Sequence, residues 1–415
     1  MDINWPQLIV SAATIVVVLH VNLMIVPYVI LLERKVASWT QDRVGPNRVG
    51  LTFGLLPNHW HMFGLGQPLA DGLKFLVKED FNPRAVDKML FFAAPVLAVV
   101  PAMIGWAVIP WGGVWDTGSE WWGVIKVTAV DANIGVIYIL AIGSLAVYGL
   151  VLGAWASNNK FSFFGGLRAT AQMLSYEIPM GLIVLCVLLM VGSTHAAEIV
   201  NHQIGYWFGV IPQWLIFQQP LAAVLFVVCL LAEANRAPFD LAEAEQELVG
   251  GYHTEYSSMK FALFFLGEYM HMITGAAFMA VMFLGGWHVP WLDYALYGGS
   301  VQPVETGFLG MLLKFGVFFG KVIFLMFVMI WIRWTIPRFR FDQLMKLAWR
   351  ALIPISLLLL MVTGVLVYLR LENWLWLGNL GVIVVGLGIA PLIPAGPSVN
   401  RRVPLAGSRF SPIEE

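Results

Sequence analysis

Carboxylates gather in the stretch RAPFDLAEAEQELVGGYHTEY, from Arg236 to Tyr256, although only 12% of the chain is charged. Glu243 and Glu247 would repel each other mildly on a helix, whereas Glu243, Glu245 and Glu247 would line one side of an extended segment. Neither arrangement favours stability. The stretch therefore predicts either a proton-binding cluster or a solvated acidic surface that docks a basic partner. Its five acids are Asp240, Glu243, Glu245, Glu247 and Glu255.

Further acids interrupt the apolar parts of the chain. Glu177 lies in RATAQMLSYEIPMGL, Glu233 ends the apolar run before the acidic stretch, and Glu268 follows in the next run. A charged side chain costs about 2.5–3.5 kcal/mol at the centre of a membrane helix, so each acid needs a reason. Coupled carboxyl groups in a narrow hydrated cavity take up and release protons as a set. We therefore favour a proton or ion path over isolated packing contacts.

Membrane helices must position these acids, because 59% of the residues are hydrophobic and the mean hydropathy is +0.77. Such values are typical of a polytopic membrane protein, with an all-α helix bundle of about nine spans. The first span is too long for a signal peptide and is preceded by Asp2 rather than by basic residues, so we expect it to be retained. The expected spans are 7–32, 89–110, 132–156, 170–192, 215–233, 261–287, 309–333, 350–370 and 375–394.

Basic residues predict the orientation of these spans. Alternate connections and the tail hold 20 of the 24 Lys and Arg residues, which places them in the cytoplasm and the N-terminus outside. The opposite connections are rich in Trp, as an interfacial belt would be. The chain is thus predicted to form one transmembrane domain, 1–394, with a cytoplasmic tail, 395–415. The predicted cytoplasmic connections are 33–88, 157–169, 234–260 and 333–350.

Three more ionisable residues lie in or beside apolar runs. Asp131 opens the span 132–156, and Lys314 and Lys321 share one face of their span, seven residues apart. Lys314 is nearer the predicted outer end, where its side chain could extend to the membrane surface.

Several function classes are excluded by what the sequence lacks. Cys186 and Cys229 both fall in apolar runs without a CxxC spacing, and His59 and His61 have no further ligands near them, so no metal or cluster site is expected. No glycine-rich phosphate motif is complete. A net charge of −1 gives no indication of nucleic-acid binding. Redox chemistry would therefore need electrons from another chain.

The first long connection carries ERKVASWTQDRVGPNRVG, in which Gly45-Pro46-Asn47 predicts a turn. The residues before it, 36–40, have the spacing of a short interfacial amphipathic helix. Apolar side chains near Trp39 could meet a lipid-soluble molecule entering from the bilayer. Arg43 or Arg48 could instead anchor phospholipids.

Six motifs in one order resemble those of the H-subunit family of NADH:quinone oxidoreductase, the bacterial counterpart of mitochondrial complex I subunit 1. They run from residue 33 to about 350 and therefore cover most of the chain. The motifs are ERKVASWTQDRVGPNRVG, GQPLADGLKFLVKED, RATAQMLSYE, AEANRAPFDLAEAEQELVGGYHTEY, FFLGEY and IRWTIPRFRFDQLMKLAW.

The resemblance implies a subunit of the bacterial inner membrane that closes a quinone cavity and begins a proton path. Quinone would be the substrate, with no cofactor on this chain. FMN and iron–sulfur clusters would belong to peripheral partner subunits, and small and antiporter-like membrane subunits and lipid would be neighbours. Glu33 and Arg43 match positions near the cavity entrance, and Asp71 matches an acid between the cavity and the path. The implied path acids are Glu177, Glu233 and Glu268, and the implied cavity-facing loop acids are Glu243, Glu245, Glu247 and Glu255. Further motif positions are matched by Arg236, Asp240 and Arg333.

The chain departs from the family pattern in three places. About a dozen residues, 51–62, stand where the family has a short link, so the cavity mouth could be built differently. Ala244 and Gln246 replace the usual glycine and serine of the acidic loop, which makes that loop stiffer. A ninth span and a basic tail extend past the usual end and could pack against lipid or subunits.

Two alternatives keep part of this interpretation. Homologous subunits serve membrane hydrogenases, formate hydrogenlyases and deazaflavin dehydrogenases, which differ in the electron donor. An independent cation or proton transporter would also carry acids near the middle of the membrane.

Overall fold

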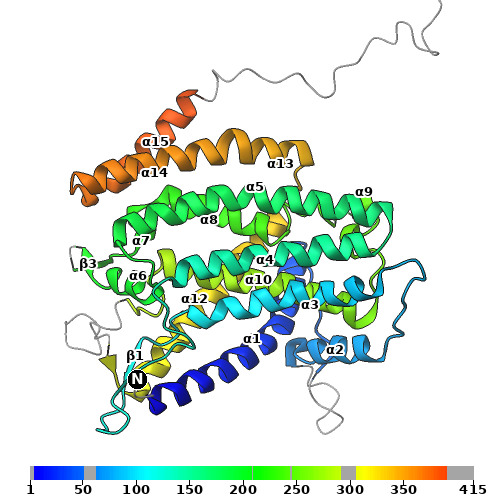
Figure 1. Ribbon diagram of the computed structural model, residues 1–415, viewed down its shortest axis with the longest axis horizontal. Coiled ribbons are helices and arrows are strands. Elements are labelled where there is room, and N and C mark those ends of the chain that lie inside the picture. The colour runs from blue at the N-terminus through cyan, green and yellow to red at the C-terminus, as the bar shows by residue number, and fades with distance from the viewer. Residues whose placement is uncertain (1–3, 51–61, 208, 244, 291–304, 390–415) are drawn as a thin grey trace, which may run out of the picture.

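A computed structural model describes residues 4–50, 62–207, 209–243, 245–290 and 305–389. Long helices lie side by side in these residues, and short strands occur at one end of the bundle (Figure 1). Eight helical segments of the described chain are long and apolar enough to cross a membrane, which confirms the predicted all-α polytopic fold. They are Trp5–Trp39 (α1), Lys88–Val108 (α3, Lys88–Ile104, and a 3-10 turn), Gly135–Ala156 (α4), Lys160–Val191 (α5), Ser258–Phe283 (α10), Phe308–Thr335 (α12), Phe341–Tyr368 (α13, Phe341–Leu347, and α14, Ile353–Tyr368) and Glu372–Ile389 (a 3-10 turn and α15, Leu375–Ile389).

The remaining predicted span, 215–233, is divided into α7 (Leu215–Gln218) and α8 (Pro220–Glu233). Pro220 is the first residue of α8. The first N–H groups of a helix have no partner within the helix, so the missing N–H of Pro220 costs no hydrogen bond. A helix of 14 residues is about 21 Å long, which is less than the roughly 30 Å of a hydrocarbon core. Glu233, its last residue, therefore ends inside the bundle rather than in water.

Helix α1 is longer than predicted, with 35 residues and a length of about 52 Å. It continues through the positions where the sequence suggested a separate amphipathic helix, so that prediction was wrong. No Gly or Pro occurs between Glu33 and Trp39 to end the helix. Amphipathic character appears instead in α2 (Gln67–Val77), where Leu69, Leu73 and Leu76 form an exposed apolar stripe.

Helix α5 is also longer than its predicted span, because it already begins at Lys160. The predicted connection 157–169 is thus reduced to three residues, 157–159, between α4 and α5. The insertion 51–62, apart from the backbone of Met62, and the tail 395–415 lie outside the described residues.

The two ends of the bundle differ in the elements that they carry. Helices α2 and α9 (Glu245–Leu248) lie at one end, and α6 (Ala196–His202) and the strands lie at the other (Figure 1). The predicted topology assigns α2 and α9 to cytoplasmic connections and α6 to an outer one, and this assignment stays a prediction. β1 pairs with β2 in an antiparallel and with β5 in a parallel manner, and β3 pairs with β4. The strands are β1 (Val114–Asp116), β2 (Val124–Lys126), β3 (Tyr206–Trp207), β4 (Ile211–Pro212) and β5 (Glu305–Thr306).

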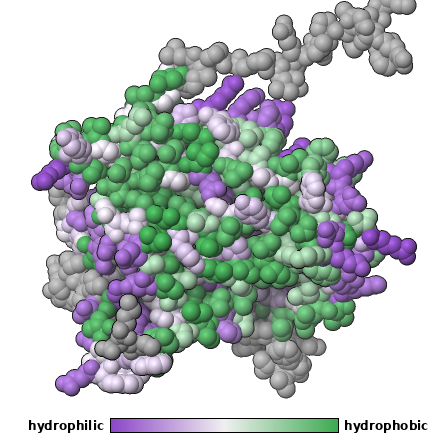
Figure 2. Space-filling view, in the orientation of Figure 1, coloured by the Kyte–Doolittle hydropathy of each residue, from purple (hydrophilic) through white to green (hydrophobic). Residues whose placement is uncertain are grey.

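The surface shows a broad apolar zone across the middle of the bundle, with hydrophilic residues gathered toward both ends (Figure 2). Large apolar side chains such as Val16, Ile178 and Val384 are exposed on the described helices. In water such an area would be unfavourable, whereas hydrocarbon tails cover it without cost. The chain is therefore a multi-pass membrane protein.

Glycine allows two close approaches that position the site. A Cβ on Gly149 of α4 would lie 2.6 Å from the Ala98 backbone nitrogen of α3, so only glycine permits this packing. A Cβ on Gly165 of α5 would lie 2.7 Å from the backbone of Gly251. Gly251 has φ +59°, and a Cβ there would lie 1.8 Å from the Ala242 carbonyl oxygen. The acidic stretch consequently folds back onto α5.

Candidate functional site

Arg236, immediately after α8, lies at the centre of the buried charges. The residue is only 3% exposed. Nη2 lies 3.2 Å from Glu268 Oε2 and Nη1 lies 3.9 Å from Glu33 Oε1, while the guanidinium stacks 4.1 Å from the Tyr269 ring centroid. Burial acts against the charged form, but Tyr269, Glu268 and Glu33 more than offset it and raise the pKa of Arg236. Arg236 therefore stays cationic.

Glu33 connects three helices at this point. The Tyr269 hydroxyl of α10 donates to Glu33 Oε2 at 2.5 Å, and Arg333, in the last turn of α12, pairs with Glu33 Oε1. Glu33 reaches these partners because α1 continues beyond its predicted end. The carboxylate thus ties α1 to α10 and α12.

Tyr252 joins the acidic stretch to α10. Its hydroxyl lies 2.8 Å from Glu268 Oε1 and 3.3 Å from Glu243 Oε1. A phenol has one hydrogen to donate, so both contacts become hydrogen bonds only when one carboxyl is protonated and donates in return. Burial, followed by the charges of Glu268 and Glu243, raises the pKa of Tyr252 well above its usual value. The phenol therefore stays protonated and two carboxyls can share a proton beside it.

Two more contacts extend the cluster. His253 Nδ1 lies 3.7 Å from Glu243 Oε1, and Arg338 Nη2 lies 2.8 Å from Asp240 Oδ2. Burial raises the pKa of Asp240 to about 6, although the charge of Arg338 acts in the opposite direction. Asp240 thus changes charge close to neutral pH.

Two small cavities continue from this cluster into the bundle. The first, of about 20 Å³, is lined by Glu268, His271 and Glu233 together with mostly apolar side chains. The second, of about 40 Å³, is lined by Glu233 and His271 again and by Gly143 of α4. About 10–15 Å³ of such volume is enough for one water molecule that has polar partners. Water can therefore lie between Glu268 and Glu233.

The acids Glu33, Glu268, Glu233 and Glu177 follow one another through the bundle and are called the acid series. Glu177 of α5 is its last member. Ser144 Oγ, one residue from Gly143, donates to Glu177 Oε1. A Cβ on Gly143 would lie 3.3 Å from Glu233 Oε1, so the Glu233 carboxyl reaches the same turn of α4 from the other side. The predicted path acids Glu177, Glu233 and Glu268 are thus neighbours in space, although they come from three helices.

Other predicted site residues lie outside this series. Asp71 of α2 pairs with Arg34 at 2.7 Å, and exposed Arg43 pairs with Gln41. Glu247 pairs with Arg168 of α5 at 2.6 Å, and Glu255 accepts a bond of 2.6 Å from Asn159. The Glu245 side chain lies outside the described residues, as does Ala244. Asp71, Glu247 and Glu255 thus pair with residues outside the group of buried charges around Arg236.

The backbone decides between the two arrangements considered for the loop acids. Helix α9 begins at Glu245, so Glu243 lies before it and Glu247 within it. Glu243 faces Tyr252, whereas the Glu247 side chain is 53% exposed. Glu243 and Glu247 therefore do not line one common surface.

Several contributing residues carried no strong signal in the sequence. Tyr252 and Tyr269 adjoin recognised motif acids, and that proximity could have indicated them. His271 and Ser144 had no such signal, because each lies in an otherwise apolar run. Arg338 lies in a predicted motif, but its pairing with Asp240 needs two segments about 100 residues apart.

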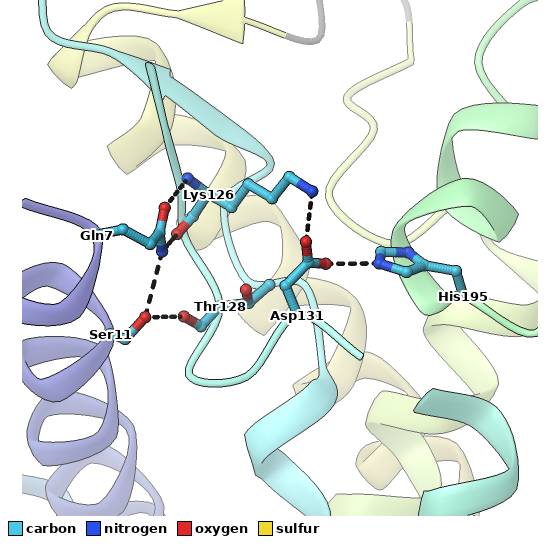
Figure 3. A network of polar contacts seen from close by, with 6 residues as sticks. All are labelled: Gln7, Ser11, Lys126, Thr128, Asp131 and His195. Atoms are coloured by element: carbon cyan, nitrogen blue, oxygen red, sulfur yellow. Dashed lines mark hydrogen bonds and ion pairs between the residues drawn. The ribbon is translucent and has the colours of Figure 1, made fainter. Parts of the chain in front are cut away.

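Asp131 belongs to a separate network at the opposite end (Figure 3). It pairs with Lys126 of β2 and lies 2.5 Å from His195 Nε2, just before α6. Burial raises its pKa, but the hydrogen bond from Lys126 and the charges of His195 and Lys126 outweigh burial, so the pKa of Asp131 lies below its usual value. Gln7 and Ser11 of α1 bond to the backbone of the same connection. This network joins α1 to the connection between α3 and α4 and to the residue before α6.

The two lysines of α12 hold structure at that same end. Lys314 is fully buried with Nζ 4.4 Å from the Trp287 ring centroid, so the predicted extension to the surface was wrong. Lys321 Nζ donates to three carbonyls that follow α10, those of Leu284, Gly286 and His288, at 2.7 to 2.8 Å. Such a cation satisfies acceptors at a helix C-terminus. Among the described residues no group of three His, Cys, Asp or Glu could hold a metal ion.

The fold and the site define a class, a polytopic membrane protein in which buried acids from several helices form a connected series. Residues 12–364 match the family model described as NADH dehydrogenase, and the chain belongs to this family. It is 42% identical to H subunit 1 of the NADH-quinone oxidoreductase of Cytophaga hutchinsonii, over 89% of this chain and 100% of that protein. The H subunit of the Leptospira biflexa enzyme is 42% identical over 90% of this chain and 99% of its own length. For the H subunit of Flavobacterium johnsoniae the identity is 43%, over 87% of this chain and 95% of that protein.

These relatives confirm the resemblance seen in the motifs. The chain is a membrane subunit of an NADH-quinone oxidoreductase and part of a complex of several subunits. The names of these relatives favour an NADH-quinone oxidoreductase over the related hydrogenases and over an independent transporter.

Proposed function

We propose that this subunit closes the quinone cavity of the complex and begins the proton path that couples quinone reduction to proton translocation. Quinone is the substrate at the Glu33 end. Partner subunits of the peripheral arm carry FMN and the iron–sulfur clusters that deliver electrons. Small and antiporter-like membrane subunits continue the path beyond Glu177, and the complex lies in the bacterial inner membrane.

The observation that carries this proposal is the connected series from Glu33 to Glu177. Arg236 lies between Glu33 and Glu268, the two cavities join Glu268 to Glu233, and Glu233 approaches the turn of α4 that bonds to Glu177. Isolated packing contacts would not need cavities large enough for water between the acids.

Charge balance indicates how the cluster responds to the quinone. Among the described residues of the cluster, three guanidinium groups face four carboxyls, so the cluster has an extra negative charge unless one carboxyl, or His253 beside Glu243, holds a proton. The carboxyls are Glu33, Asp240, Glu243 and Glu268, and the cations are Arg236, Arg333 and Arg338. Reduction of quinone to quinol takes up two electrons from the partner subunits and two protons. Quinone and quinol are both neutral, so the charge near Glu33 changes because the protons are drawn from the cluster. That change alters how tightly Glu268 and Glu243 bind their shared proton beside Tyr252. It thereby favours transfer of this proton toward Glu233.

The quinone head group belongs at the ends of α1 and α12, where Glu33 meets Arg333. The larger apolar cavity, of about 330 Å³, lies between α1, α3 and the outer connections, with Trp106 and Trp111 in its wall. It touches none of the acids of the series. We therefore assign the quinone cavity to the acidic end, where peripheral subunits complete it.

The charged residues at this end of the bundle serve both docking and coupling. Exposed Glu247 and Arg43 face the side on which peripheral subunits would bind, and Asp71 holds α2 against α1 through Arg34. Among the loop acids with described side chains, Glu243, Glu247 and Glu255, only Glu243 contacts Tyr252. Tyr252 in turn contacts Glu268.

Replacement of Glu177 tests the proposal. In inner-membrane vesicles that contain the whole complex, Glu177→Gln should lower quinone-linked proton pumping by a factor of about ten or more, because the neutral amide cannot carry the proton. NADH oxidation with a soluble electron acceptor should continue, since it uses the peripheral arm only.

The matched control is Glu198→Gln, an acid of α6 at the opposite end of the bundle. It should pump as the unmodified complex does. Normal pumping in Glu177→Gln, at normal subunit content, would remove Glu177 from the path and refute the proposed coupling role.

A further inference from the structure

His271 of α10 lies where the two cavities of the series meet. It is one of three titratable residues in their described walls, and Glu233 and Glu268 are the other two. Glu268 lines only the smaller cavity, whereas His271 and Glu233 line both. Because His271 follows Glu268 by three positions, both side chains lie on the same face of the helix. The ring is therefore placed between the acid cluster and the deeper cavity.

The state of the ring follows from its contacts. His271 bonds to the backbone carbonyl of Ala98 on α3, while its Nε2 is shielded from solvent and has no hydrogen-bond partner in the described residues. The bond to Ala98 must then use Nδ1, and a carbonyl can only accept, so Nδ1 carries the hydrogen. In the neutral ring this leaves Nε2 as an acceptor with a free lone pair.

A purely structural histidine would satisfy both ring nitrogens or leave one in bulk water, since an unmade hydrogen bond in a buried site destabilises the fold. Nε2 of His271 does neither. Water in the adjoining cavities would give it a partner, and the 20 and 40 Å³ volumes are large enough for that. The remaining wall is mostly apolar, with Leu150, Met173 and Phe264 on one side and Met180 and Phe278 on the other.

We propose that His271 carries the proton between Glu268 and Glu233, with Nε2 as the atom that binds it. This role rests on the proposed function of the acid series. In the first step the O–H bond of the Glu268 carboxyl breaks and the proton passes, through water, to Nε2. Glu268 becomes a carboxylate and the ring an imidazolium. In the second step the Nε2–H bond breaks and the proton passes to the Glu233 carboxylate, which restores the neutral ring. No electrons are transferred, and the Nδ1–H bond to Ala98 stays in place throughout.

Two substitutions separate proton transfer from packing and hydration. His271→Gln keeps a polar side chain of similar reach that can bond to water but cannot bind a proton at neutral pH. His271→Leu removes both properties. In vesicles with the whole complex, both variants should lower quinone-linked turnover and pumping by about ten-fold or more, with the KM for quinone unchanged. The pH profile of turnover should lose the limb that belongs to the histidine. Glu233 and Glu268, the titratable groups that face the ring in the unmodified protein, are kept in both variants, so the limbs of the pH profile that belong to them should remain.

His202→Gln is the matched control, since it makes the same replacement at the exposed end of α6. Activity with a soluble electron acceptor reports how much complex is assembled, and turnover is divided by it. A His271→Gln variant with normal pumping and an unchanged pH profile would overturn the inference, even if His271→Leu were slow, because hydration alone would then suffice. Failure of the proposed function is distinguishable, since in that case Glu177→Gln would also pump normally.

Discussion

Asp240 shows how a single residue responds to its surroundings. The carboxyl is buried beside Arg338, and its pKa is raised from 3.8 to about 6 because burial outweighs the attraction of the guanidinium. The folded state thus binds this proton more tightly than the unfolded chain does. The resulting stabilisation is complete below about pH 4 and is lost as the pH rises through about 6.

Asp240→Asn should remove this pH dependence. The thermal midpoint of the purified complex should fall less between pH 4.5 and pH 7 in the variant than in the unmodified protein, by an amount equivalent to at most about 1.4 kcal/mol per pH unit. Asp342→Asn is the control, because Asp342 is an exposed carboxyl that pairs with Lys346 at 3.4 Å. Equal slopes in the unmodified protein and in Asp240→Asn would contradict the raised pKa.

Close helix packing is what brings the acids together at the scale of the elements. Glu33, Glu268, Glu233 and Glu177 come from α1, α10, α8 and α5, and one turn of α4 contacts both of the last two acids. The approach of α4 to α3 depends on Gly149, whose hydrogen faces the Ala98 backbone. The Ala98 carbonyl also accepts the hydrogen bond from His271. The contact between α3 and α4 therefore positions the acid series as well as the two helices.

Gly149→Ala should therefore destabilise the subunit. A methyl group 2.6 Å from a backbone nitrogen forces α3 and α4 apart, since backbone atoms cannot rotate away. We expect a loss of about 1–3 kcal/mol, seen as a lower thermal midpoint of the complex and lower quinone-linked activity.

Gly181→Ala provides the control within α5, because a Cβ at Gly181 meets nothing within 4 Å. Alanine also has the higher helix propensity, by about 1 kcal/mol, so this variant should be at least as stable as the unmodified protein. Similar midpoints for the two variants would show that the α3–α4 contact is not as tight as described.

The last acid of the series, Glu177, lies at the edge of the molecule. Glu177 is only partly buried, while Glu233 and Glu268 lie inside the bundle. A path that ends at a partly exposed acid of a membrane helix needs a neighbouring subunit to continue it.

The chain purified alone and reconstituted in lipid vesicles should for this reason show no robust ion transport, measured with a pH-sensitive dye under an imposed gradient. The complete complex in the same vesicles should acidify them when NADH and quinone are supplied. Robust antiport by the isolated chain would instead support an independent transporter.

The class of fold and the identity of most acids could be predicted from the amino-acid sequence alone. Long apolar runs leave the backbone no alternative to helices in a bilayer, because each N–H and C=O must be bonded within its own segment. Glu177, Glu233 and Glu268 stood out for the related reason that charge in hydrocarbon is costly. Six ordered motifs indicated the family.

Tertiary structure decided which acids meet and which residues connect them. The close approach at Gly149, the packing of Gly251 against Gly165 and the pairing of Asp240 with Arg338 all depend on contacts between distant segments. Lys314 was misjudged because its partner Trp287 lies on another segment. His271 gave no signal along the chain, since a residue in an apolar run becomes part of a proton path only when two cavities and the Ala98 carbonyl are brought to it.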